Sequence, residues 1–104
     1  FVRNYFYIKD AVSGYLTIAE NIEKSQGEAF NLGTNERYSV LEITNTILKI
    51  MKSKLKPIIK NEATNEIVEQ FLSIKKASTL LKWKASYSTE KALKETIEWY
   101  KKYV

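Results

Sequence analysis

The chain has 104 residues, of which 44% are hydrophobic, and its 17 basic and 12 acidic side chains give a formal net charge of +5. This length suits one small domain, residues 1–104, and the hydrophobic and aromatic content excludes a disordered chain. The sequence contains no Cys and no His, which excludes disulfides, thiolate nucleophiles, the commonest metal ligand and the commonest general base. Any chemistry must therefore use Tyr, Lys, Glu, Asp or Ser.

Neither a membrane nor a nucleic acid is expected as a partner. No apolar run approaches the roughly 18 to 20 residues that span a bilayer, and the charges of Arg3, Lys9 and Asp10 exclude a signal peptide. We therefore expect a cytoplasmic protein. Most basic residues are Lys beside Glu at helical spacings, which is typical of a solvated surface and not of a dense phosphate-binding track.

The first third of the chain predicts a strand, a helix and a second strand. Residues 2–8 are rich in β-branched and aromatic side chains and predict a strand, with Asp10 as the N-cap of the next helix. That helix has apolar residues three to four positions apart and is expected to end within 24–27. A short strand is predicted at 28–33.

The middle of the chain predicts a capped helix and two extended segments. Ser39 and Glu42 have the S-x-x-E spacing of a capping box, so a helix is predicted over 39–52. Residues 57–59 predict an edge strand, because their leading proline cannot donate a ladder hydrogen bond. A brief extended segment is predicted at 70–72.

Two helices are predicted in the last third. One begins at Ser73, with Trp83 packed at its end. The other covers 88–103, where Glu and Lys lie four residues apart and the apolar residues share one face.

The pattern Tyr-x-x-x-Lys occurs at Tyr5/Lys9 and at Tyr87/Lys91. A Lys one helical turn from a Tyr lowers the pKa of the phenol, which suits acid–base catalysis. Tyr and Lys are so frequent here that about one match arises by chance, and neither Tyr lies inside a predicted helix. We therefore predict no catalytic residue in this chain.

Three segments carry a resemblance to a known family. They are Arg-Asn-Tyr-Phe-Tyr-Ile-Lys-Asp at 3–10, Leu-Leu-Lys-Trp-Lys-Ala-Ser-Tyr-Ser at 80–88 and Thr-Ile-Glu-Trp-Tyr at 96–100. In this order they resemble the C-terminal part of the extended short-chain dehydrogenase/reductases, the NAD-dependent epimerases and dehydratases of nucleotide sugars. Segment 61–73 is similar to one in dehydratases of the CDP-glucose type.

The resemblance implies an α/β fold, a small C-terminal substrate-binding lobe that lacks the Rossmann half. We expect about four helices and two or three short strands. Gly14, Gly27 and Gly33 are isolated and cannot form the Gly-rich turn that binds a pyrophosphate. No cofactor is therefore expected in this fragment, which is predicted to be inactive alone, and NAD is expected in the full-length parent.

Arg3 is the candidate substrate-binding residue. In the related enzymes an arginine at this place contacts the diphosphate of the nucleotide sugar, and a guanidinium can bind two phosphate oxygens at once. A surface arginine paired with a nearby carboxylate is the alternative. Asn4 stands where the family usually has Asp, and 61–73 holds no Arg or Lys where many members have a second diphosphate-binding arginine.

These observations predict the substrate-side lobe of an NAD-dependent nucleotide-sugar dehydratase or epimerase, which seats the nucleotide diphosphate. A stand-alone, non-catalytic binding or interaction module is the alternative. A lobe without its Rossmann half exposes surface that the parent buries, with Phe1, Phe6 and Tyr7 as candidates. A homo-oligomer is therefore expected.

Overall fold

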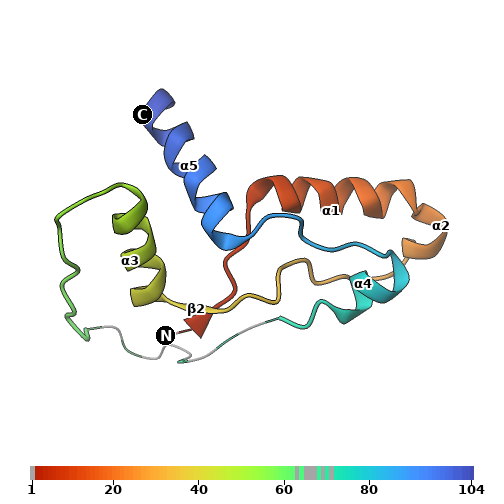
Figure 1. The fold of residues 1–104 in the computed structure, drawn as a ribbon. Coiled ribbons are helices and arrows are strands. Elements are labelled where there is room, and N and C mark those ends of the chain that lie inside the picture. The colour runs from red at the N-terminus through yellow and green to blue at the C-terminus, as the bar shows by residue number, and fades with distance from the viewer. Residues whose placement is uncertain (1, 63, 65–67, 69, 71) are drawn as a thin grey trace.

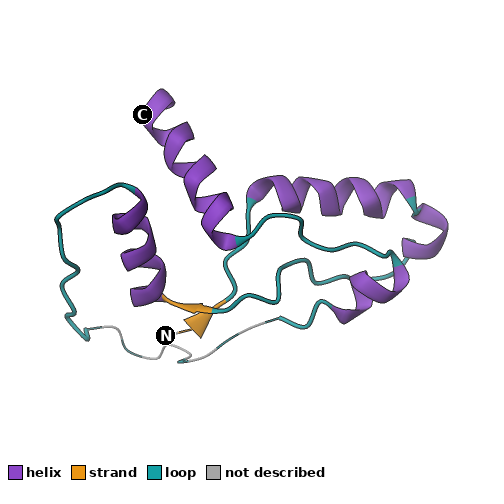
Figure 2. Ribbon diagram, viewed as in Figure 1, coloured by secondary structure: helices purple, strands orange, loops and turns teal. Residues whose placement is uncertain are grey.

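The computed structural model of the protein describes residues 2–62, 64, 68, 70 and 72–104. Its elements, in chain order, are β1 (Val2–Arg3), α1 (Ile8–Glu20), α2 (Ile22–Ser25), β2 (Tyr38–Ser39), α3 (Val40–Ile50), α4 (Lys75–Leu80) and α5 (Thr89–Tyr103). The result is a small helical domain with a two-stranded sheet (Figure 2). None of the described helices is long and apolar enough to cross a membrane.

The elements form a flat molecule of 50 × 36 × 20 Å. Figure 1 shows α1, α2 and α4 at one end, α3 at the other, and the first turn of α5 between them. The antiparallel pair β1–β2 joins the two ends, with Val2 opposite Ser39 and Arg3 opposite Tyr38. The sheet therefore places Arg3 beside Tyr38, where the segment that leads into α1 meets the strand that leads into α3.

The hydrophobic core lies between α1 and α4. Its buried members are Ala77, Leu81 and Trp83, and the half-buried side chains packed against them are Ile18, Phe30, Leu32 and Ala85. Trp83 Nε1 donates to Ser13 Oγ on α1 at 3.2 Å. The predicted packing of Trp83 at the end of its helix is confirmed.

Local capping signals place the starts of α3 and α5 correctly. At the start of α3, Ser39 Oγ accepts from the Glu42 amide and Glu42 Oε1 accepts from the Ser39 amide, each at 3.0 Å. This capping box satisfies two N–H groups that otherwise lack partners. Ser88 likewise caps α5, where its Oγ accepts from the Lys91 amide at 3.2 Å. The helices predicted at 39–52 and 88–103 are confirmed.

The strands predicted from the sequence differ most from the structure. β1 ends at Arg3 instead of residue 8; residues 4–7 belong to no strand or helix, and α1 begins at Ile8. No ladder forms at 28–33, where the backbone groups of 29–33 make no hydrogen bond to another described residue. Segment 57–59 is also irregular, and Ile58 is 82% exposed. Strand propensity describes a fit to a half-buried sheet, and these two segments have no neighbouring strand among the described residues.

Val68 and Gln70 lie beside β1. Val2 N donates to Val68 O at 2.8 Å, and Gln70 N donates to Val2 O at 2.9 Å. Of the extended segment predicted at 70–72, Phe71 lies outside the described residues. β1 is therefore hydrogen-bonded on both edges, to β2 on one side and to Val68 and Gln70 on the other.

Asp10 is not the N-cap of α1. The cap residue is Tyr7, and Asp10 lies in the first turn with 2% of its surface exposed. Its Oδ1 accepts from the amide and the hydroxyl of Ser86 at 2.9 and 3.0 Å, and its Oδ2 accepts from the Tyr87 amide at 3.2 Å. Asp10 therefore fastens the start of α1 to the loop that leads into α5.

Candidate functional site

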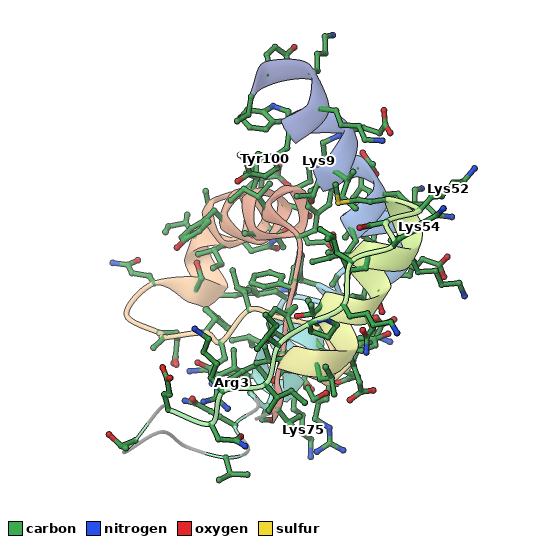
Figure 3. All side chains as sticks on the ribbon, turned by 90° about the vertical axis from the view of Figure 1, so that its left-hand side faces the viewer. Arg3, Lys9, Lys52, Lys54, Lys75 and Tyr100 are labelled. Carbon is green, nitrogen blue, oxygen red and sulfur yellow. The ribbon has the colours of Figure 1, made fainter. Side chains whose placement is uncertain are left out.

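Arg3 is half-buried at the end of a strand that is supported on both edges. The guanidinium Nη1 donates to the carbonyl oxygen of Val2 at 2.7 Å. This contact turns the guanidinium towards its own strand. Figure 3 shows Arg3 and Lys75 towards one end of the molecule, and Lys9 and Tyr100 towards the other. The candidate residue is thus well separated from the Lys9 end of α1.

Asn4 follows Arg3 and connects three segments. Asn4 Nδ2 donates to the carbonyl oxygens of Thr34 and Glu36 at 2.8 and 3.2 Å. Asn4 Oδ1 accepts from the Leu72 amide at 2.8 Å. A single side-chain amide therefore joins the end of β1 to the loop before β2 and to the segment that precedes α4.

Glu36 extends this connection to α5. Its Oε2 accepts from the Thr89 amide at 3.0 Å, from the Thr89 hydroxyl, and from the Tyr38 hydroxyl at 3.5 Å. Thr89 is the first residue of α5, where a carboxylate also interacts favourably with the helix dipole. The loop 34–36, which binds the Asn4 side chain, is thereby fixed to the start of α5.

Two hollows meet at Asn4. A mainly apolar groove of about 810 Å³ runs between residues 4–9 and α5, with Phe6 and Trp99 in its wall. A more polar pocket of about 620 Å³ lies between the loop before β2 and the start of α4. Its basic lining residues are Arg37, Lys75 and Lys84. The sequence carried no signal for this basic grouping, because its members are far apart along the chain.

The two Tyr-x-x-x-Lys pairs do not bring a phenol hydroxyl to an ammonium group. Lys9 Nζ pairs with Glu95 Oε1 at 3.1 Å, and this hydrogen bond and charge raise the pKa of Lys9 above its ordinary value of 10.5. Lys91 Nζ lies over the face of the Tyr87 ring, 5.3 Å from its centroid. Among the described residues, no group of acidic side chains is arranged to hold a metal ion.

Comparison with known proteins gives one consistent class. No protein-family model matches the chain. UDP-glucose 4-epimerase 4 from Oryza sativa subsp. japonica is 33% identical over 103 residues, which cover 97% of this chain and 28% of the relative. dTDP-D-glucose 4,6-dehydratase from Mus musculus is 27% identical over 111 residues, which cover 96% of this chain and 29% of the relative. The structure of UDP-glucose 4-epimerase from Bifidobacterium longum in complex with NAD+ and UDP matches with a TM-score of 0.87 and 27% identity, covering 98% of this chain and 30% of that one.

The fold is thus shared with epimerases and dehydratases of nucleotide sugars. The chain is a C-terminal part of an extended short-chain dehydrogenase/reductase, and the predicted family is confirmed. It spans 28% to 30% of the length of these relatives.

Proposed function

We propose that the chain is the substrate-side lobe of an NAD-dependent nucleotide-sugar epimerase or dehydratase, and that Arg3 contacts the diphosphate of the sugar nucleotide. The position of Arg3 is the observation that carries this proposal. It ends a strand hydrogen-bonded on both edges, and its neighbour Asn4 is held by three hydrogen bonds. A guanidinium on such a fixed support can bind two phosphate oxygens with little loss of conformational freedom.

The residues of this chain do not fit a dinucleotide cofactor. Gly14 lies inside α1, and Gly27 and Gly33 lie apart in loops, so they do not form a Gly-rich turn between a strand and a helix. We therefore assign NAD to the part of the enzyme outside this chain. In the parent, NAD bound by that part would supply hydride transfer, while this lobe would bind and orient the nucleotide sugar.

An uncovered apolar face on α1 supports docking onto the nucleotide-binding half. Ile8, Val12, Tyr15 and Leu16 share one face of the helix and are 51% to 71% exposed. Residues 29–33, whose backbone groups make no hydrogen bond to another described residue, follow later in the chain and pack Phe30 and Leu32 into the core beside α1. Both features are typical of a surface that another part of a protein covers.

The α1 face replaces Phe1, Phe6 and Tyr7, the residues predicted from the sequence, as the proposed contact surface with the nucleotide-binding half. Phe6 is 37% exposed, and Tyr7 is half-buried, with its ring 4.8 Å from the ring of Tyr87. Phe1 lies outside the described residues. The α1 face is the larger apolar surface among these candidates.

Titration of the ¹⁵N-labelled chain with UDP-glucose tests the diphosphate role, because NMR detects weak binding. We expect saturable shifts at the Arg3 side chain and at the amides of 2–5, and none with uridine, which lacks the diphosphate. Arg3→Ala is expected to abolish these shifts. Arg37→Ala removes the other arginine and is expected to leave them unchanged. Equal binding by the wild type and Arg3→Ala would refute the role of Arg3, and an absence of binding by the wild type would favour the stand-alone module.

A further inference from the structure

Asn4 is placed to set the direction of the neighbouring arginine. The ladder between β1 and β2 contains only two residue pairs, Val2 with Ser39 and Arg3 with Tyr38. A pairing this short is marginal by itself. Beyond Arg3, the next fixed point of the chain is the side chain of Asn4, which is hydrogen-bonded to Thr34, Glu36 and Leu72.

We propose that Asn4 is a positioning residue for Arg3, a role that rests on the proposed binding of a diphosphate by Arg3. The Asn4 amide holds the backbone at the end of β1 at one angle to the loop 34–36 and to Leu72. The direction in which the Arg3 side chain leaves the strand follows from that angle. Loss of the Asn4 contacts lets the strand end turn, and the guanidinium then meets the diphosphate in fewer productive orientations.

The chemistry of the Asn4 contacts requires an amide. Both hydrogens of Nδ2 are used, one towards Thr34 O and one towards Glu36 O, while Oδ1 accepts from the Leu72 amide. A carboxylate has acceptors only, so an Asp at position 4 would face two carbonyl oxygens here. The loop 34–36 of this chain is therefore matched to Asn at position 4.

The Asn4 contacts also tie the site to the last helix. Glu36, whose carbonyl oxygen accepts from Asn4, binds the amide and the hydroxyl of Thr89 through its carboxylate. A chain of direct contacts thus leads from the residue beside Arg3 to the start of α5. Displacement of the Asn4 amide disturbs the site before it disturbs the core, because none of its partners belongs to the buried cluster around Trp83.

The test compares Asn4→Ala with Asn31→Ala. Asn31 is exposed and makes no hydrogen bond to a described residue, so its variant is the matched control. For each folded chain, NMR gives the dissociation constant for UDP, and ¹⁵N relaxation gives the order parameter of the Arg3 Nε–H group. We expect Asn4→Ala to weaken UDP binding by about tenfold and to lower the order parameter of Arg3 Nε–H. Asn31→Ala should change neither quantity.

The outcomes separate the positioning role from a purely structural one. Lower thermal stability of Asn4→Ala with an unchanged dissociation constant and unchanged Arg3 order would overturn the inference. Should Asn4→Ala not fold, Asn4→Ser keeps an oxygen acceptor for the Leu72 amide and is expected to show the same two changes. Failure of the wild-type chain to bind UDP through Arg3 would instead refute the proposed function, which the Arg3→Ala variant reports independently.

Discussion

Replacement of Asp10 by Asn distinguishes the observed structure from a simple helix cap. At an N-cap position Asn and Asp are nearly equivalent, so the substitution would be almost neutral there. The structure instead shows a buried carboxylate that accepts three hydrogen bonds from Ser86 and Tyr87. An amide keeps one oxygen for Ser86 but turns an N–H donor towards the Tyr87 amide, which is also a donor.

The cost follows from the number and type of bonds. A hydrogen bond to a charged group contributes about 1.5 to 3 kcal/mol, and leaving a buried donor unpaired costs about 1 to 3 kcal/mol. Asp10→Asn loses the bond to Tyr87 and weakens those to Ser86, so we expect a loss of roughly 3 kcal/mol. For a domain of this size the melting temperature should then fall by about 12 to 24 °C.

Thermal unfolding followed by far-UV circular dichroism at neutral pH measures this loss. Asp10→Ala removes all three acceptor contacts and should be at least as unstable as Asp10→Asn. Glu20→Gln is the matched acid-to-amide control at an exposed residue of α1 and should melt close to the wild type. A change of less than about 0.5 kcal/mol for Asp10→Asn would show that the carboxylate does not hold the loop before α5.

Three further predictions concern the surface and the pH dependence. The uncovered α1 face should make the isolated chain self-associate, and Leu16→Glu should shift it to the monomer in sedimentation velocity; undiminished association of Leu16→Glu would contradict this surface. Hydrogen bonds from the amide and hydroxyl of Ser39 lower the pKa of the exposed Glu42 below its ordinary value of 4.5. The stability from this carboxylate is therefore present above pH 4.5 and is lost as the pH falls through the lowered folded value, whereas Glu42→Gln should not show that loss. An unshifted Glu42 titration by ¹³C NMR would argue against the capping box. In Asn4→Asp, the introduced carboxyl should have a pKa above that of an ordinary Asp, because only its protonated form can donate to a carbonyl oxygen. This variant should therefore gain stability relative to the wild type as the pH falls. A difference in unfolding free energy that stays constant across pH would count against the Asn4 geometry.

Local signals predicted the helices, because their determinants lie within a few residues. The capping box of Ser39 and Glu42 contains both partners of each hydrogen bond, and the cap at Ser88 needs only the next turn. Asp10 has the same local appearance as a cap. Its partners Ser86 and Tyr87 lie 76 and 77 residues away, so only the fold reveals its role.

Strands and the site depend on distant parts of the chain. Phe30 and Leu32, two apolar residues of the strand predicted at 28–33, do pack against the core, but a ladder also requires a neighbouring backbone. Arg3 was chosen from the family resemblance, and its diphosphate role stays a prediction. The three partners of Asn4 had no sequence signal, because two are backbone carbonyl oxygens and one is a backbone amide.

The most direct test of the central claim observes the diphosphate itself. ³¹P NMR of UDP-glucose, recorded with increasing amounts of the chain, reports contact with both phosphorus atoms. If Arg3 seats the diphosphate, the wild-type chain broadens or shifts both signals and Arg3→Ala does not. Signals that respond equally to the wild type and to Arg3→Ala, or to neither, would contradict the assignment of this chain as a diphosphate-seating lobe.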